Sequence, residues 1–301
     1  MDKKVVYAIV VTYNPDIHLL EAEYHSISSQ VDLIIYVDNG SENCADIKKW
    51  SIEKDKLSFI WLEDNEGLGV AQNAGIKRAL DAGVSHIIIF DQDSVVAEDF
   101  VNILLSIENK AISEGIKVGL TGPVYRSYED DYTYPVWSVD NGKLIKIPQK
   151  NINVYRTVTH IIASGSLIRR EVLLEVGLMR EDFFLGFIDY EYCFRAAQYG
   201  YKAIVTNKAC MYHKMGDSQI VIHGSKIGLY SPFRRYFDCR NTFLIQREKS
   251  FPKVVRRYYL KLIFGKVIIS LLYGPKRWQQ FKYCLYGFYD GILGKTGNCC
   301  I

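Results

Sequence analysis

The sequence predicts an α/β protein in which a mostly parallel, doubly wound sheet is followed by a helical C-terminal region. Short apolar strands alternate with helical stretches through the first ninety residues, at the spacing of βαβ units. Polar side chains follow the ends of these strands, where sheets of this kind bind ligands. After residue 230 the pattern becomes helical, aromatic and basic.

Four strands are expected in the first ninety residues, and each is apolar on both faces, which indicates burial on both sides. Helical stretches separate the strands, and the last of these, at 67–82, stops at Gly83. The strands span residues 5–11, 33–37, 57–62 and 87–90.

The second half of the chain has a different pattern. Extended segments rich in Tyr, Thr and Val occupy 123–161, and Asn141-Gly142 within them predicts a hairpin turn. Helices are expected again at 170–176 and 189–199.

Length and composition leave room for one large α/β domain with an appendage. A hydrophobic content of 49% and a charged content of 24% indicate a globular rather than a disordered protein. The net charge of +3 says little about partners, but basic residues gather between 249 and 282, where no Asp or Glu occurs. They are Lys253, Arg256, Arg257, Lys261, Lys266, Lys276, Arg277 and Lys282.

Two further observations predict a cytosolic protein. The N-terminal residues lack the apolar region and cleavage site of a signal peptide. The seven cysteines show no CxxC spacing and are expected to be reduced thiols.

The most informative stretch is Asp91-Gln92-Asp93, which directly follows the apolar strand at 87–90. On extended backbone, carboxylates two residues apart point to the same side. Mg²⁺ and Mn²⁺ prefer oxygen ligands and often bind through one or two carboxylates together with substrate phosphates. Asn14, Asp38 and Asp64 follow other strands, so these side chains are expected at one edge of the sheet. The alternative is a solvated acidic turn.

Three enzyme classes compete for this pattern. A dinucleotide-binding dehydrogenase is weakly indicated, because Gly67 and Gly69 are followed by Gln72 where G-x-G-x-x-G needs a third glycine. A phosphohydrolase would use Asp91 as nucleophile, although its motif normally opens the catalytic core. A nucleotide-sugar transferase would use a metal at Asp91 and Asp93 to neutralise the leaving diphosphate. A glycan-binding module without activity is a fourth reading, and no nucleic-acid module accompanies the basic tail.

A series of short segments, spread over roughly residues 5–247, resembles family 2 glycosyltransferases. The first segments are 10–14 (VVTYN), 37–41 (VDNGS), 65–69 (NEGLG), 73–75 (NAG) and 90–94 (FDQDS). Three later segments look like the rhamnosyltransferase branch, namely 163–166 (ASGS), 187–195 (FIDYEYCFR) and 212–216 (YHKMG).

The resemblance implies a GT-A fold and inverting transfer of L-rhamnose from dTDP-L-rhamnose, with Mg²⁺ or Mn²⁺ as cofactor. It implies a catalytic domain at 1–229, with a nucleotide-sugar-binding half at 1–122 and an acceptor-binding half at 123–229. Residues 230–301 form the C-terminal region. A UDP-sugar donor (galactofuranose, glucose or galactose) is the main alternative, because thymine and uracil present the same edge to Asp38.

The resemblance also implies roles for single residues. Asp189 would be the base that deprotonates the acceptor, with Glu191 orienting it. Asp91, Asp93 and His213 would hold the metal. The nucleotide sugar would contact Thr12, Asn14, Asp38, Asn65, Gly67, Asn73, Asp91 and Gln92.

Each role has a structural alternative. Asp38 could cap a helix or complete a turn, and residues 65–67 could form only a tight turn. Asp189 could be a helix N-cap, and Glu191 could pair with Arg195 at i, i+4. His213 could be structural.

The apolar stretch at 258–273 is too short and too charged for a comfortable transmembrane span. Its aromatic and basic residues predict a helix that lies in a membrane interface. Bacterial relatives in this family act on polyprenyl-diphosphate-linked saccharides at the cytoplasmic face of the cell membrane. The resemblance therefore implies that location, a lipid-linked saccharide acceptor and a role in cell-surface polysaccharide synthesis. The alternative is a packed helical subdomain or a homodimer contact.

Overall fold

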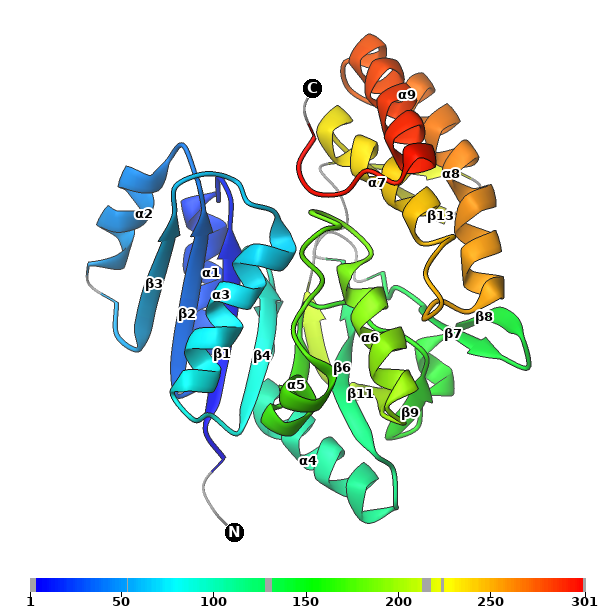
Figure 1. The fold of residues 1–301 in the computed structure, drawn as a ribbon. Coiled ribbons are helices and arrows are strands. Elements are labelled where there is room, and N and C mark those ends of the chain that lie inside the picture. The colour runs from blue at the N-terminus through cyan, green and yellow to red at the C-terminus, as the bar shows by residue number, and fades with distance from the viewer. Residues whose placement is uncertain (1–3, 53, 128–131, 213–217, 223–224, 300–301) are drawn as a thin grey trace.

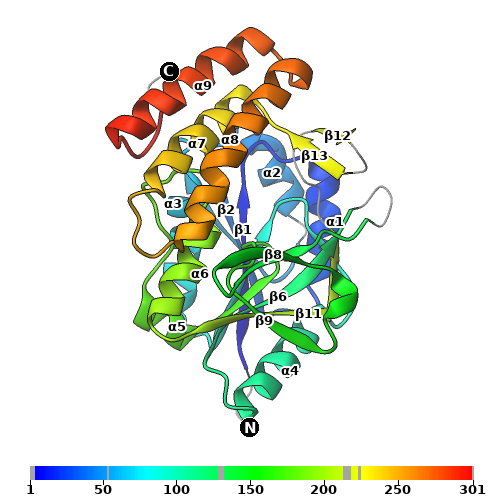
Figure 2. The same cartoon turned by 90° about the vertical axis from the view of Figure 1, so that its right-hand side faces the viewer.

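The computed structural model describes residues 4–299, apart from 53, 128–131, 213–217 and 223–224. Its largest element is a mixed sheet whose strands follow the order β3-β2-β1-β4-β10-β6-β11-β5, with β9 paired to β11 (Figure 1). Helices cover both faces of this sheet, and three further helices lie at one end of the molecule (Figure 2). The expected α/β class with a helical C-terminal region is confirmed.

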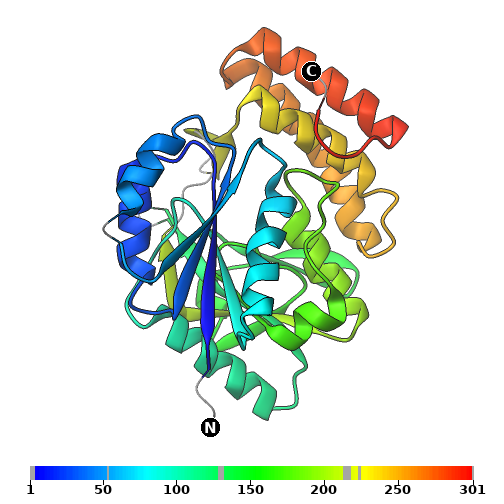
Figure 3. The same cartoon turned by 60° about the vertical axis from the view of Figure 1, so that its left-hand side comes forward.

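The first four strands are parallel neighbours, as their apolar sequences predict. Side chains at alternate positions of these strands point to opposite faces of the sheet and pack into two separate cores. Ile9 and Ile35 pack with α3 on one face, whereas Ala8 and Ile34 pack with α1 and α4 on the other (Figure 3). The elements are β1 (Val6–Thr12), α1 (Ile17–Ile27), β2 (Leu33–Asn39), α2 (Cys44–Ser51), β3 (Leu57–Leu62), α3 (Leu68–Asp81), β4 (His86–Asp91) and α4 (Phe100–Ser113).

The second half extends the same sheet but changes its direction. The central strand β10 (Ser166–Arg169) runs antiparallel to β4 and to β6 (Val118–Arg126). Strand β11 (Lys202–Tyr212) runs parallel to β6 and pairs antiparallel with β5 (Val95–Val96) and β9 (Tyr155–Val158). Helices α5 (Arg170–Val176) and α6 (Ile188–Gln198) confirm the helices expected there.

Three short elements lie outside the sheet. The predicted hairpin is formed by β7 (Val136–Asp140) and β8 (Lys143–Ile147). Asn141 and Gly142 both have positive φ at its turn, as a two-residue hairpin turn requires. A 3-10 turn (Gln149–Asn151) follows, and β12 (Ser218–Ile222) pairs with β13 (Ser225–Leu229).

The C-terminal region consists of α7 (Pro232–Leu244), α8 (Lys253–Tyr273) and α9 (Arg277–Leu293). Helices α7 and α9 pack closely at Gly287, where an added Cβ would lie 2.5 Å from the carbonyl oxygen of Tyr236. Near its start, α8 packs against residues 123–229, because Tyr258 contacts Trp137 and Tyr259 contacts Phe187. Within the described part of the chain, no helix is long and apolar enough to cross a membrane.

Two glycine-to-alanine changes test this packing. Gly287→Ala should lower the free energy of unfolding, because the new methyl group meets the backbone of α7. Gly265→Ala is the matched control within α8, where nothing lies within 4 Å of the added Cβ. It should stabilise the protein by about 1 kcal/mol through helix propensity. Urea unfolding measures both, and equal effects of the two changes would contradict the close contact of α7 with α9.

Candidate active site

The carboxyl ends of β1 and β2 meet at a buried carboxylate. Asp38 is only 1% exposed and accepts hydrogen bonds from the Thr12 hydroxyl at 3.0 Å and the Ser41 hydroxyl at 2.6 Å. The Ser41 amide donates to the other Asp38 oxygen at 3.0 Å, which completes a turn. Helix α2 has Asn43 as its N-cap, so Asp38 does not cap it. The turn alternative is therefore observed, and the contact of Asp38 with a nucleobase stays a prediction.

Asn14 and Gln92 fasten neighbouring strand ends. Asn14, with a φ of +48°, accepts a hydrogen bond from the Glu42 amide at 2.8 Å through its side chain. The Gln92 side chain accepts from the Tyr13 amide at 2.8 Å and donates to the Tyr13 carbonyl at 3.3 Å. Gln92 thus ties the end of β4 to the end of β1.

Asn65, Gly67 and Asn73 surround the start of α3. Asn65 accepts hydrogen bonds from the Asn39 side chain at 3.0 Å and from the Gly67 amide at 3.1 Å. Gly67 has a φ of +93°, and an added Cβ would lie 2.9 Å from the carbonyl oxygen of Phe184. Asn73 is buried, and its amide exchanges two hydrogen bonds of 2.8 Å with the backbone of Met179. Asn73 therefore holds a distant segment.

Asp91 and Asp93 lie half-buried at the end of β4. The Asp91 amide donates to the Ser164 hydroxyl at 3.1 Å, and the carbonyl of Asp91 accepts from the Ser94 amide at 3.1 Å. Burial and the charge of Asp93 raise the pKa of Glu23, a residue of α1. The Asp93 carboxylate therefore lies near α1. The carboxylate oxygens of both residues suit a divalent ion with diphosphate ligands.

The third expected metal ligand, His213, lies outside the described residues. Among the residues that are described, no group of three or more His, Cys, Asp or Glu side chains is placed to hold a metal. Asp91 and Asp93 are the two predicted ligands that the structure describes, and their role in metal binding stays a prediction.

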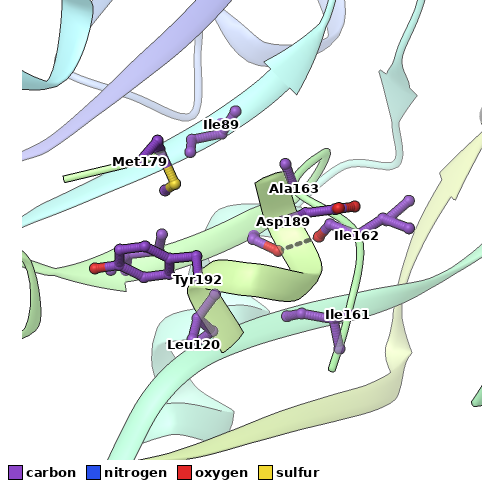
Figure 4. A pocket seen from close by; sticks show the side chains of 10 residues that line it. Ile89, Leu120, Ile161, Ile162, Ala163, Met179, Asp189 and Tyr192 are labelled. Atoms are coloured by element: carbon purple, nitrogen blue, oxygen red, sulfur yellow. Dashed lines mark hydrogen bonds between the residues drawn. The ribbon is translucent and has the colours of Figure 1, made fainter. Parts of the chain in front are cut away.

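Asp189 lies in the first turn of α6, beside a small apolar cavity. Burial, together with the negative charge of Asp91, raises its pKa to about 6. The Tyr190 amide donates to its carboxylate at 2.9 Å. Figure 4 shows Asp189 among the side chains of Ile161, Ile162, Ala163 and Tyr192. The helix N-cap is Phe187, so the capping alternative for Asp189 is wrong.

Glu191 occupies a different position on α6. It is buried, and Arg195 donates to both of its oxygens at 3.0 Å. The same guanidinium donates to the carbonyls of Val176 and Leu178. The i, i+4 pairing is therefore observed, and a role for Glu191 in orienting the acceptor stays a prediction.

Sequence reasoning assigned no role to Ser164, although its segment contributes to the family resemblance. Its hydroxyl accepts from the Asp91 amide and pairs with the Ser94 hydroxyl at 2.7 Å. These hydrogen bonds attach the end of β4 to the segment before β10. The signal was present in the small residues at 163–166, but the contact joins residues about seventy positions apart.

Replacing Asp189 by Asn removes the negative charge of the side chain and keeps its size, so it tests how much the buried charge costs in stability. Asp189→Asn should raise the free energy of unfolding at pH 8 by roughly 1–3 kcal/mol, because one pKa unit corresponds to about 1.36 kcal/mol. The folded-state pKa lies above the ordinary 3.8, so the wild-type carboxylate costs stability only where it ionises. The gain should therefore shrink as pH falls through 6 toward 4.

Urea unfolding in EDTA at several pH values measures this gain. Glu98→Gln, which changes an exposed carboxylate, is the control and should have little effect. A gain that does not depend on pH, or a loss of stability at pH 8, would contradict the buried environment of Asp189.

Comparisons with known proteins agree with this geometry. The model of the glycosyl transferase family 2 matches residues 7–177. The dTDP-rhamnosyl transferase RfbF of Shigella flexneri is 32% identical over 298 residues, covering 97% of each chain. The hexosyltransferase Agl10 of Haloferax volcanii, named for low-salt glycan biosynthesis, is 24% identical over 96% of this chain and 92% of its own.

Solved structures show the same fold. GalNAc-T7 with UDP, GalNAc and Mn²⁺ has a TM-score of 0.57 at 15% identity over 91% of this chain, which spans 58% of that structure. TarS 1–349 of S. aureus with UDP-GlcNAc has a TM-score of 0.54 at 14% identity, covering 96% and 81% of the two chains. The expected GT-A fold is confirmed, and the chain belongs to glycosyl transferase family 2.

Proposed function

We propose that this protein is a metal-dependent, inverting glycosyltransferase that moves L-rhamnose from dTDP-L-rhamnose to a hydroxyl group of a saccharide. The observation that carries the proposal is the pair of Asp91 and Asp189. They come from separate elements, they interact electrostatically, and burial gives Asp189 a pKa of about 6. The name of the Shigella flexneri relative supports the donor.

Each carboxylate has a distinct task in this reaction. A divalent ion held by Asp91 and Asp93 would neutralise the charge of the leaving diphosphate. Asp189 would accept the proton of the acceptor hydroxyl on the opposite side of the sugar ring. A base with a pKa near 6 is mostly ionised at neutral pH, and general-base assistance is typically worth about 10²–10⁴-fold.

The nucleotide would lie over the ends of β1 and β2. There Thr12, Asn14 and Asp38 form a hydrogen-bonded edge, and a pyrimidine N–H could take the place of the Ser41 hydroxyl at Asp38. Asn65, Gly67, Asn73 and Gln92 would act mainly by fixing the backbone around this edge. Both Mg²⁺ and Mn²⁺ suit oxygen ligands.

A second pocket, lined by Tyr190 but not by Asp189, supports the assignment of residues 123–229 to the acceptor. Trp137, Tyr125 and Tyr190 line it, together with His160. Burial lowers the pKa of His160 to about 4, so its imidazole is neutral at physiological pH. Aromatic rings and a neutral imidazole suit an uncharged sugar ring, which offers C–H faces and hydroxyl groups.

The same fold could use a UDP-sugar, since thymine and uracil share the edge that Asp38 would contact. A phosphohydrolase with Asp91 as nucleophile and a glycan-binding module without turnover are less well supported, because the family match covers the strand ends and the Asp91 segment together.

Thermal unfolding with nucleotide sugars tests the donor and the metal together. With Mn²⁺ or Mg²⁺, dTDP-L-rhamnose and dTDP at 100 times their Kd should stabilise the protein by about 2.7 kcal/mol. With an unfolding entropy of about 2.1 cal/mol/K per residue, the melting temperature of a 301-residue chain should rise by about 4 °C. Asp91→Ala should abolish the metal-dependent part, whereas Glu98→Ala, a nearby exposed carboxylate, should keep it.

The outcomes separate the alternatives. A larger shift with a UDP-sugar would overturn the donor and keep the reaction class. No shift with any nucleotide would contradict the transferase proposal.

We also propose that the acceptor is lipid-linked and that the protein binds a membrane surface through α8 and α9. The exposed apolar surface does not cover the whole stretch expected at 258–273, because Tyr258 and Tyr259 at the start of α8 pack on residues 123–229. Large apolar side chains instead line the end of α8 and all of α9. They include Phe264, Ile268, Leu272, Tyr273, Trp278, Phe281, Leu285, Tyr286, Tyr289, Ile292 and Leu293.

Charge favours an anionic bilayer over a second copy of the chain. Between residues 249 and 299, Asp290 is the one acidic residue of the sequence. Its carboxylate accepts a hydrogen bond from the Tyr236 hydroxyl and forms an ion pair with Lys295. Exposed basic residues such as Lys276, Arg277 and Lys282 flank the apolar face. Each could add about 1 kcal/mol of attraction to anionic lipid. Figures 1 and 2 place these helices at the same end as the carboxyl ends of β1 and β4.

Sedimentation with liposomes tests the surface. The wild type should pellet with vesicles rich in phosphatidylglycerol, and less with pure phosphatidylcholine. Trp278→Ser combined with Leu285→Ser should weaken binding at least tenfold. Leu174→Ser is the control, because Leu174 is 63% exposed on α5. A wild type that stays in the supernatant would overturn the proposal, and dimerisation that these serines abolish would favour the homodimer alternative.

A further inference from the structure

The turn that leads into α6 has an unusual backbone. Phe184 and Phe187 have φ angles of +62° and +64°, and Gly186 between them has +81°. Left-handed backbone at a bulky residue costs of the order of 1–3 kcal/mol and persists only where the surroundings enforce it. Asp189 follows this turn by two residues, so the turn determines where its carboxylate lies.

Two adjacent side chains of α7 hold this turn from one side. The Arg240 guanidinium donates to the Phe183 carbonyl at 2.8 Å and to the Asn241 side chain at 3.0 Å. The Asn241 amide donates to the carbonyls of Phe183 at 2.9 Å and Leu185 at 2.8 Å. Phe184 itself stacks on Phe237, with ring centroids 4.7 Å apart.

The burial of Arg240 points to a role other than stability. Its side chain is fully buried, and burial lowers its pKa. Its hydrogen bonds within the described part of the chain go to the Phe183 and Gly297 carbonyls, to Asn241 and to Tyr236, with no carboxylate among them. A buried cation without an ion pair is costly. Such a group is retained where its geometry is needed.

The other side of the same turn is held by the start of α3. The Leu68 amide donates to the Phe184 carbonyl at 2.7 Å, and Asn73 binds Met179 a few residues earlier. The turn at 183–187 therefore lies between the start of α3 and α7, and both sides bond to its backbone.

We infer that Arg240 and Asn241 are positioning residues that hold the turn at 183–187 and thereby fix Asp189 opposite Asp91. The inference rests on the proposed function, because it assigns the pair to the catalytic base. It makes α7 part of the catalytic machinery, although α7 lies in the C-terminal region.

The first test measures coupling without any substrate. In EDTA at pH 8, Asp189→Asn should raise the melting temperature of the wild type. In the Asn241→Ala background the turn relaxes and water reaches residue 189, so this rise should shrink by at least half. Gln246→Ala is the matched control, since this amide, which lies just after α7, donates to the Thr242 and Arg256 carbonyls. In that background the rise should stay as in the wild type. An equal change in all three backgrounds overturns the inference.

The second test uses turnover. Asn241→Ala and Arg240→Lys should lower kcat for rhamnosyl transfer at least about tenfold, because misplacing a reacting group is costly. The KM for dTDP-L-rhamnose should change less than threefold, and the apparent pKa of the base in the pH profile should fall. Gln246→Ala should leave both parameters unchanged.

The two tests fail in different ways. A wild type without transfer would overturn the proposed function, while the coupling measurement would still decide the role of Arg240 and Asn241. A rise in KM alone, with kcat and the pH profile unchanged, overturns the positioning role.

Discussion

The structure depends on the segment from Met179 to Phe187, which lies between the start of α3 and α7. Asn73 and Leu68 bind its backbone from the side of α3, and Arg240 and Asn241 bind it from α7. Each contact satisfies a backbone carbonyl or amide that would otherwise be buried without a partner. The left-handed residues at 184 and 187 are stable only inside this arrangement, and the first turn of α6 begins where it ends.

Electrostatics explains why this position suits a base. Burial raises the pKa of Asp189, and the charge of Asp91 raises it further, so the two carboxylates oppose each other's ionisation. Positive charge bound at Asp91 would remove the second effect and leave the first. In the proposed reaction, a divalent ion at Asp91 would therefore let Asp189 ionise more readily, which would link metal binding to the protonation state of the base.

Much of the structure of residues 1–122 could be predicted from sequence, because it depends on local patterns. Apolar strands and the residues that follow them place Thr12, Asp38 and Asp91 at one edge without knowledge of distant contacts. The contacts of Asn73 and Gln92 could not be predicted, since each side chain bonds to a distant backbone segment that local spacing does not specify. The pairing of Glu191 with Arg195 was one of the alternatives that the i, i+4 spacing offered.

The second half was harder to predict for a related reason. Strand β10 lies between β4 and β6 although it follows both in sequence, and its antiparallel direction has no local signal. The exposed face of α9 alternates with buried Gly287 and Gly291, which fit against α7. Without α7 in view, its aromatic residues could equally belong to a core.

The stereochemistry of transfer tests the central claim most directly. The claim is that Asp189 and Asp91 act on opposite faces of the sugar, with Asp189 as a base rather than a nucleophile. The enzyme would be incubated with dTDP-L-rhamnose labelled with ¹³C at the anomeric carbon, a divalent metal and a lipid-linked acceptor, and the product followed by ¹³C NMR. The account predicts a product of inverted anomeric configuration from the first turnover. A product that retains the configuration of the donor would contradict it.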